Sequence, residues 1–391
     1  MLKKSCAALL LIFALCANVL SAYAAPAPGP AAPSLNVNAK AAVLMEPVSG
    51  VLLLSQNPHE KLAPASVTKV MSMLLIYEAI ADGRIKWDDV VTVSDHAAGM
   101  GGSQIFLEPM EQQTVRDLTK AVVIASANDA VVALGEYIAG SEEGFVLMMN
   151  NRARDLGLRD THFVNACGLD ADGHVTSAYD IALMTRELML KHPEVFEFTK
   201  IWMDSITHRT ARGESEFGLT NTNRLIRSYT GATGLKTGST AQALYCIAAT
   251  ATRDGMDQIA VVLGAPDPGV RFGEAMKMLD YGFANYSVKK GEAADTVKDT
   301  VKIFKGDMET IGVAVKEQVT CLVPKGKTAE MESKIELLDT LSAPAPKGTK
   351  AGEIVYTFEG KEVGRSDLVT VEDVAKASLG NILGRTLRDW F

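Results

Sequence analysis

The sequence predicts an α+β domain, followed by a small all-β domain and a C-terminal amphipathic helix. Strand-like apolar runs occupy residues 41–45 and 51–55 near the start of the chain, and they recur at 243–250 and 258–263. Helical patterns fill most of the chain between them, so a sheet built from both ends would carry an inserted helical layer. After residue 286, short alternating runs separated by Lys-Gly and Pro-rich turns indicate a β sandwich or barrel.

Residues 1–24 have the pattern of a secretory signal peptide. Two lysines precede an apolar run at 7–20, and an Ala-Tyr-Ala cleavage pattern ends at residue 24. The apolar run is shorter than the ~20 residues that a membrane-spanning helix needs, which favours cleavage over the alternative of a retained anchor. Residues 25–34 are rich in proline and alanine and predict an extended tether. We therefore expect an exported protein.

The elements of the first domain, residues 35–287, follow from apolar patterns and stop signals. A Pro-Val-Ser-Gly turn predicts a hairpin between the first two strands. The helix at 66–81 is apolar nearly all round, which indicates a central buried helix, and Asp-Gly ends it. Caps and glycines delimit the other helices, which we expect at 115–125, 130–139, 141–156, 177–190 and 270–283.

The second domain, residues 288–370, is expected to be built from strands. Its alternating runs lie at 297–303, 310–315, 318–322, 333–338 and 353–358. Residues 371–391 then place apolar side chains at helical spacing and end in Trp390 and Phe391. Two interpretations stay open for this amphipathic helix. It docks on its own protein, or it lies on a membrane surface with its aromatic end inserted.

Composition argues against several other classes of protein. The net charge is -8, and no Lys/Arg stripe is interleaved with aromatics, so we expect no nucleic-acid partner. After signal cleavage Cys167, Cys246 and Cys321 remain; their wide spacing indicates small buried hydrophobes rather than a redox pair or zinc ligands. Asp170 and Asp172 lack the downstream glutamate that a calcium loop needs. No metal and no cofactor are expected.

The pair Ser66 and Lys69 is the first candidate for chemistry. On a helix, residues at i and i+3 share a face, so the lysine amine can reach the serine hydroxyl. Burial would disfavour the charged amine, and a neutral amine beside a hydroxyl is a general base beside a nucleophile. The S-x-x-K pattern is weak by itself, because it recurs at Ser287 in a polar stretch.

Ser126, Ala127 and Asn128 form a second motif in a break between helices. If Ser66 attacks a carbonyl and Lys69 takes its proton, the hydroxyl of Ser126 can relay that proton to a leaving amine. The amide of Asn128 can hold both the lysine and a substrate amide by hydrogen bonds.

Lys236, Thr237 and Gly238 form a third motif that leads into a strand. The lysine charge and the threonine hydroxyl suit a substrate carboxylate. Gly238 would let a peptide lie close to the strand, because it has no side chain. The backbone N–H groups of Ser66 and Ser239 are the natural oxyanion donors.

With these motifs in this order, the chain resembles the penicillin-recognising serine enzymes, and within them the low-molecular-mass D-alanyl-D-alanine carboxypeptidases. The likeness extends from residue 35 to residue 283. It is carried by the segments 64–69, 102–107, 114–118, 168–170, 234–238 and 279–283.

The resemblance implies a β-lactamase/transpeptidase-like fold, in which a helical region is inserted into an antiparallel sheet. It also implies the β domain and an amphipathic membrane anchor after it. The implied reaction removes the terminal D-alanine from a peptidoglycan stem pentapeptide, through an acyl-Ser66 intermediate that water resolves. β-Lactams would acylate the same serine. The implied location is the outer face of the cytoplasmic membrane.

Two alternatives stay beside this interpretation, a class A-like β-lactamase and an inactive wall-binding protein. The chain has no Glu-x-x-Leu-Asn segment between the second and third motifs, which favours a peptidase over a β-lactamase. Ser66, Lys69 and Lys236 are all present, which argues against an inactive protein. Ala127 departs from the glycine usual in this subfamily. For His174 we favour a structural role in its loop, and Arg224 fits either the carboxylate site or the surface.

Overall fold

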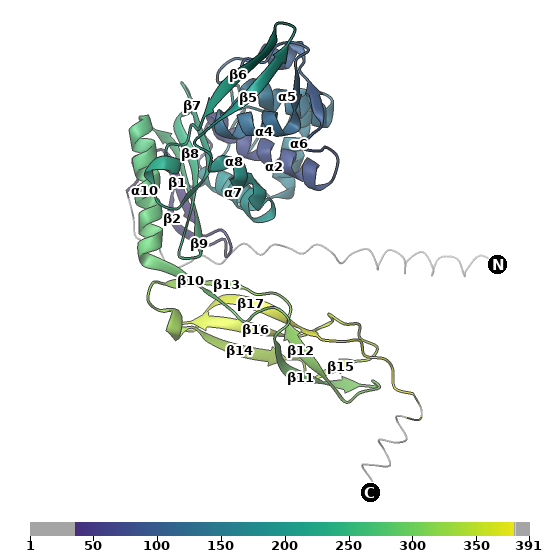
Figure 1. Cartoon of the computed structure of the whole chain (residues 1–391). Coiled ribbons are helices and arrows are strands. Elements are labelled where there is room, and N and C mark those ends of the chain that lie inside the picture. The colour runs from purple at the N-terminus through teal and green to yellow at the C-terminus, as the bar shows by residue number, and fades with distance from the viewer. Residues whose placement is uncertain (1–35, 379, 381–391) are drawn as a thin grey trace, which may run out of the picture.

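The protein is described by a computed structural model that covers residues 36–378 and residue 380. Figure 1 shows a first body of helices around a sheet, and a second body made of strands. The predicted signal peptide (1–24) and tether (25–34) lie outside the described residues. Within the described part of the chain, no helix is both long enough and apolar enough to cross a membrane.

The first body is organised around a five-stranded antiparallel sheet in the order β2-β1-β9-β8-β7. The two N-terminal strands thus join three strands from much later in the chain, which confirms the sheet built from both ends. Helix α10 (Pro268–Asn285) packs on one face, and the inserted helices cover the other. The strands are β1 (Ala41–Met45), β2 (Leu52–Gln56), β7 (Ala232–Thr240), β8 (Leu244–Arg253) and β9 (Met256–Ala265).

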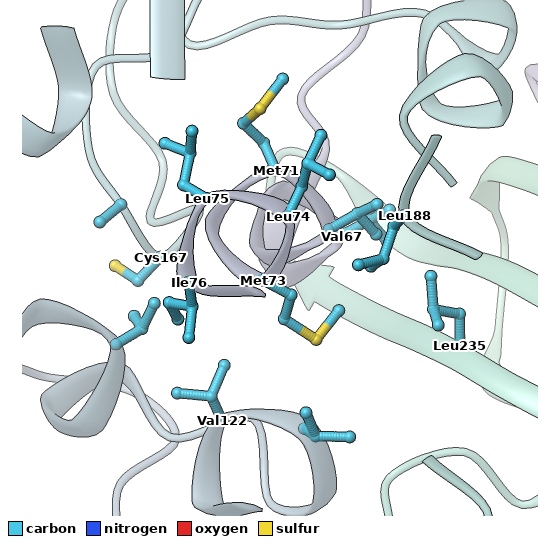
Figure 2. Packing of buried hydrophobic residues seen from close by; sticks show 14 of the residues in the cluster. Val67, Met71, Met73, Leu74, Leu75, Ile76, Val122, Cys167, Leu188 and Leu235 are labelled. Carbon is cyan, nitrogen blue, oxygen red and sulfur yellow. The ribbon is translucent and has the colours of Figure 1, made fainter. Parts of the chain in front are cut away.

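The inserted layer surrounds α2, whose side chains are buried on nearly every side. Figure 2 shows this helix enclosed by apolar side chains that include Val122, Leu188 and Leu235. The helices of the layer are α2 (Lys69–Ala81), α3 (Asp95–Ala98), α4 (Val115–Ile124), α5 (Asn128–Ala139), α6 (Glu142–Asp155), α7 (Ala178–Lys191), α8 (Phe196–Thr199) and α9 (Leu225–Ser228), with the short turn η2 (Pro193–Val195) before α8. Three of them begin at predicted serine or threonine caps, Thr114, Ser141 and Ser177.

Several features of the first body differ from the sequence prediction. The helix expected from residue 66 begins instead with a 3-10 turn, η1 (Ala65–Thr68), and α2 starts at Lys69. Ala65 has a φ of +48°, which a continuous α-helix does not allow. The hairpin of β5 (Met203–Thr210) and β6 (Gly213–Thr220) was not predicted, because polar residues occupy both of its faces. A short pair, β3 (Val90–Thr92) with β4 (Gln112–Thr114), was also missed.

The second body is all β, as predicted. A six-stranded sheet runs in the order β14-β16-β17-β12-β11-β15, and β10 pairs with β13. The predicted boundary after residue 287 falls inside β10, which pairs with the second body. The elements are β10 (Tyr286–Lys290), β11 (Val297–Phe304), β12 (Thr310–Val315), β13 (Thr320–Pro324), η3 (Thr328–Glu330), β14 (Glu332–Leu337), β15 (Thr340–Ser342), β16 (Lys350–Phe358) and β17 (Lys361–Thr370).

The C-terminal helix does not begin at residue 371 as predicted. Residues 371–378 are not helical, and two of them form bridges to the second body, Val374 with Ala345 and Lys376 with Gly306. Val374 is 2% exposed and belongs to the apolar core of that body, which explains why this part of the periodic pattern is used for packing. Residue 379 and residues 381–391 lie outside the described residues.

Candidate active site

Ser66 and Lys69 meet where the turn η1 passes into α2. The Nζ atom of Lys69 lies 3.0 Å from Oγ of Ser66. Ser66 is half-buried and therefore reachable from solvent, whereas the side chain of Lys69 is fully buried. The pair thus combines an accessible hydroxyl with a desolvated amine.

Lys69 Nζ has two more acceptors within hydrogen-bond distance. It donates to Oδ1 of Asn128 at 2.6 Å and to the carbonyl oxygen of Cys167 at 2.8 Å. Burial lowers the pKa of Lys69 to about 8, against smaller opposing effects from the charges of Cys167 and Asp129. About a tenth of the amine is therefore neutral at pH 7, far more than for an ordinary lysine, and the neutral amine is the form that acts as a general base.

The second motif lies at the start of α5. The side chain of Asn128 is fixed from both ends, because its Nδ2 also donates to the carbonyl oxygen of Gly101 at 2.7 Å. Ser126 has a φ of +64°, and its buried Oγ has no hydrogen-bond partner among the described residues. Strained backbone and unpaired buried hydroxyls are costly, and both occur preferentially at functional sites.

The third motif is part of β7, which packs against η1. A Cβ atom on Gly238 would lie 2.7 Å from the amide nitrogen of Ser66 and 2.9 Å from that of Val67. The glycine is thus required by the approach of the two backbones, and not only by room for a peptide as the sequence suggested. Oγ1 of Thr237 donates to Oγ1 of Thr222 at 2.7 Å, and the next residue after the glycine, Ser239, is exposed.

Two buried basic side chains, from Lys236 and Arg271, lie at β7. Lys236 is 1% exposed, and its Nζ donates to the carbonyl oxygen of Thr237 at 3.0 Å. Arg271 of α10 is 7% exposed, and its Nη1 donates to the carbonyl oxygen of Gly238 at 3.2 Å. Burial lowers the pKa of Lys236 well below its ordinary value, and the charges of Lys69 and Arg271 lower it further. Within residues 36–378, no carboxylate forms an ion pair with Lys236 or Arg271, so an anion bound here would be their acidic partner and would raise the lowered pKa of Lys236.

The structure therefore brings the three motifs to one place, with Lys69 bonded to Ser66 and Asn128 and with Gly238 against the amide of Ser66. Three contributors were missed by sequence reasoning. The carbonyls of Gly101 and Cys167 carry no residue-type signal, since any residue offers a backbone oxygen. Arg271 lies on a different element from β7, and nothing in its helical pattern marks it.

The structure shows the surroundings of His174 and Arg224, for which the sequence allowed two interpretations each. His174 is buried, and its Nε2 lies 2.8 Å from Oγ1 of Thr68. Its Nδ1 accepts from the amide of Val164 at 3.0 Å, so Nε2 carries the proton and donates it. Burial lowers the pKa of His174 to about 4, which keeps it neutral and structural. Arg224 is exposed, and its positive charge contributes to the lowered pKa of Arg271. Cys167, Cys246 and Cys321 are buried free thiols, as expected.

Comparison with known families gives two matches along the chain. Residues 27–267 match the family described as D-alanyl-D-alanine carboxypeptidase, and residues 286–376 match the C-terminal domain of penicillin-binding protein 5. Among curated proteins, the chain is 44% identical over 353 residues to D-alanyl-D-alanine carboxypeptidase DacF of Bacillus subtilis (strain 168), covering 90% of each chain. It is 36% identical over 363 residues to DacC of Escherichia coli (strain K12), covering 90% of this chain and 87% of the relative.

Among solved structures, the chain is similar to penicillin-binding protein 5 from Haemophilus influenzae. The TM-score is 0.78 at 32% identity, and the match covers 89% of this chain and all of the other. Penicillin-binding protein 6B from Escherichia coli matches with a TM-score of 0.69, also at 32% identity, over 88% of this chain and 100% of the other.

Proposed function

The chain belongs to the D-alanyl-D-alanine carboxypeptidase family, and from that premise we propose that Ser66 is its acylated nucleophile and Lys69 its general base. The enzyme is a serine-type D-Ala-D-Ala carboxypeptidase of the low-molecular-mass penicillin-binding proteins. The observation that carries the residue assignment is the 3.0 Å contact between the buried Nζ of Lys69, at the start of α2, and Oγ of the half-buried Ser66 in η1.

The hydrogen bonds of Lys69 suit a neutral amine. A neutral amine has two N–H donors and one lone pair. The two N–H groups can remain on Asn128 Oδ1 and on the carbonyl of Cys167, and the lone pair then faces Ser66 Oγ. In that state the serine hydroxyl donates to the lysine, which is the arrangement needed for proton removal during attack.

Two buried basic side chains without an acidic partner among the described residues support recognition of a C-terminal carboxylate. Lys236 uses one acceptor, the carbonyl of Thr237, and so keeps donors free for an anion. Arg271 adds a second positive charge beside β7. Thr237, which is itself part of β7, adds a hydroxyl group. We propose that these three groups hold the carboxylate of the terminal D-alanine. Charge-assisted hydrogen bonds of this kind are the strongest available for anchoring an anion.

The proposed reaction has two halves. Ser66 Oγ forms a bond to the carbonyl carbon of the penultimate D-alanine while Lys69 takes its proton. The backbone N–H groups of Ser66 and Ser239 stabilise the oxyanion. The C–N bond then breaks, and Ser126 passes the proton to the leaving amine of the terminal D-alanine. In the second half water attacks the ester carbon, the bond from that carbon to Ser66 Oγ breaks, and a proton from the water restores the Ser66 hydroxyl while the shortened peptide leaves with a free carboxyl group.

The alternatives are not favoured. Every curated relative named above is a D-alanyl-D-alanine carboxypeptidase, and both family matches point the same way. A class A-like β-lactamase would use a separate glutamate to activate the deacylating water, and the chain has no Glu-x-x-Leu-Asn segment between the second and third motifs. An inactive wall-binding protein would have no reason to keep the amine of Lys69 buried against Ser66.

The substrate class is peptidoglycan peptides that end in D-Ala-D-Ala, and β-lactams are the covalent inhibitors. We further propose that the natural substrate is the stem pentapeptide and that the enzyme is exported. Residues 1–24, with the pattern of a signal peptide, support export. The apolar spacing of the sequence 379–391, which ends in Trp390 and Phe391, supports attachment to the outer face of the cytoplasmic membrane.

Intact-mass measurement after treatment with benzylpenicillin tests the assignment. The wild-type protein should gain one penicilloyl adduct, which peptide mapping should locate on Ser66. Ser66→Ala should gain none. Ser287→Ala, which removes the serine of the second S-x-x-K pattern on β10, is the matched control and should be acylated like wild type. A wild-type protein that stays unmodified, or an adduct that persists in Ser66→Ala, would refute the assignment.

A further inference from the structure

Phe106 combines exposure with an unfavourable backbone conformation. The residue is 68% exposed, and its backbone φ is +61°, in the left-handed region. A bulky residue is rarely found there, because the conformation costs free energy that no burial of this ring recovers. Packing therefore does not explain why a phenylalanine stands at this position.

The conformation of Phe106 is held by a buried carboxylate. The amide nitrogens on either side of it, those of Ile105 and Leu107, both donate to Oδ2 of Asp129 at 3.1 Å. Asp129 is 1% exposed, and burial raises its pKa. The loop is thus clamped from beneath at the two peptide groups that fix the direction of the ring.

The same loop forms a wall of the active site. The amide nitrogen of Asn128 donates to the carbonyl of Ser103 at 2.7 Å, and its side-chain Nδ2 donates to the carbonyl of Gly101. Phe106 is three residues beyond Ser103, so their Cα atoms are at most about 11 Å apart. The ring is therefore displayed close to the residue that holds Lys69.

One edge of the ring is supported and the rest is free. Phe217 of β6 meets it edge to face, with ring centroids 5.9 Å apart and an angle of 67°. Behind Phe217 stands His208, at 5.5 Å between ring centroids, and its Nδ1 lies 2.7 Å from Oε1 of the buried Glu111. The ring is thus backed by a second aromatic layer, while its exposed face remains available for a ligand.

We propose that Phe106 is a specificity-determining residue, whose ring contacts an aliphatic side chain on the substrate residue that precedes D-Ala-D-Ala. This rests on the proposed function, together with the role expected for Asn128 from the sequence, whose side-chain amide would hold an amide of the acyl part of the peptide. The substrate residue that precedes D-Ala-D-Ala is joined directly to the alanine that carries the scissile carbonyl. The amides on both sides of Phe106 bond to the carboxylate of Asp129, the next residue after Asn128, and this places the ring within range of a long substrate side chain beside Asn128. A flat apolar ring adds contact area to an aliphatic chain and requires no charge.

Two synthetic peptides test the proposal, N-acetyl-Xaa-D-Ala-D-Ala with Xaa either glycine or Nε-acetyl-lysine. The readout is the ratio of their kcat/KM values. Wild type should prefer the lysine derivative, and Phe106→Asn should reduce that preference by about three- to tenfold, the size of one aromatic contact. Asparagine tolerates the left-handed backbone, so the loop should persist without the ring. Phe106→Tyr should keep the preference.

Leu147→Asn is the matched control, because Leu147 is an exposed apolar residue, 61% accessible, on α6. It should leave the ratio unchanged. A wild-type ratio of one, or an unchanged ratio in Phe106→Asn, would overturn the proposal, as would a loss of thermal stability with no change of ratio. Acylation by benzylpenicillin distinguishes a failure of this inference from a failure of the proposed function. A wild type that forms the adduct but shows no role for Phe106 refutes only this inference, whereas absence of the adduct refutes the proposed function.

Discussion

Lys69 Nζ and Ser66 Oγ lie 3.0 Å apart although the two residues belong to different kinds of helix. Ser66 is in the 3-10 turn, and Lys69 is the first residue of α2. In a 3-10 turn, residues at i and i+3 are eclipsed, so the pair aligns at least as well as on an α-helix. The tight turn also leaves Ser66 half-buried while Lys69 enters the apolar core.

The first prediction concerns the pH dependence of acylation. Because burial lowers the pKa of Lys69 to about 8, and the neutral amine is the reactive form, the second-order rate constant should rise with pH and level off above that value. Below the pKa it should fall about tenfold per pH unit. Stopped-flow acylation with a fluorescent penicillin between pH 5.5 and 9.5 measures the profile.

Asn128→Asp supplies a directional control for that profile. A carboxylate in place of the amide oxygen 2.6 Å from Lys69 Nζ would favour the charged amine, so the midpoint should move upward. A profile that is flat across the range in wild type, or a midpoint that moves downward in the variant, would contradict Lys69 as the base.

The second prediction concerns Gly238. A methyl group there would lie 2.7 Å from the amide nitrogen of Ser66, so β7 and η1 must move apart. Displacing an oxyanion donor costs about a hundredfold or more in rate, and Gly238→Ala should lose at least that much in acylation. Gly218→Ala in β6 is the matched control, because its added methyl would meet no atom within 4 Å. Acylation of Gly238→Ala at the wild-type rate would show that the two backbones can separate without harm.

The third prediction concerns stability in acid. Burial lowers the pKa of His174 to about 4, whereas in the unfolded chain it would be near the ordinary 6.5. Between these values the unfolded state binds a proton that the folded state does not, so the free energy of unfolding falls as pH falls. From pH 7 to pH 5 this single group should remove about 2 kcal/mol.

Urea unfolding at the two pH values measures that loss in wild type and in His174→Asn. The variant should be less stable at pH 7 but should lose about 2 kcal/mol less than wild type on acidification. Identical acid sensitivity in wild type and His174→Asn would mean that His174 is protonated within the folded protein.

The parts of the site that were predictable are those in which side-chain chemistry and local spacing coincide. Ser66 and Lys69 are three residues apart, and the apolar run after them explains the desolvation of the amine. The carbonyl of Cys167 and the guanidinium of Arg271 could not be found in this way. Both reach the site through long-range packing, 98 residues from Lys69 in one case and 33 residues from Gly238 in the other.

The fold also has parts that were predictable from the sequence and parts that were not. Strands β8 and β9 are buried over most of their length, and their continuous apolar runs predicted them directly. The β5–β6 hairpin is mostly exposed, so no apolar face marks it, and it is held by polar contacts such as His208 with Glu111. Residues 371–378 show the opposite error. Their apolar positions fit a helix, but bridge pairing with the β domain places Val374 in its core instead.

The last prediction uses that correction to test membrane attachment. Deleting residues 371–391 would remove Val374 from the core and the bridges to Ala345 and Gly306, so loss of the β domain would confuse the result. A stop after Ser378 keeps those contacts and removes only the segment that ends in Trp390 and Phe391. The shortened protein should leave the membrane fraction while it retains full acylation by benzylpenicillin and the wild-type melting temperature. Trp390→Ser with Phe391→Ser in the full chain should weaken vesicle binding in the same direction, because interfacial aromatics contribute to such anchoring. Membrane association that survives truncation after Ser378 would place the attachment elsewhere in the protein.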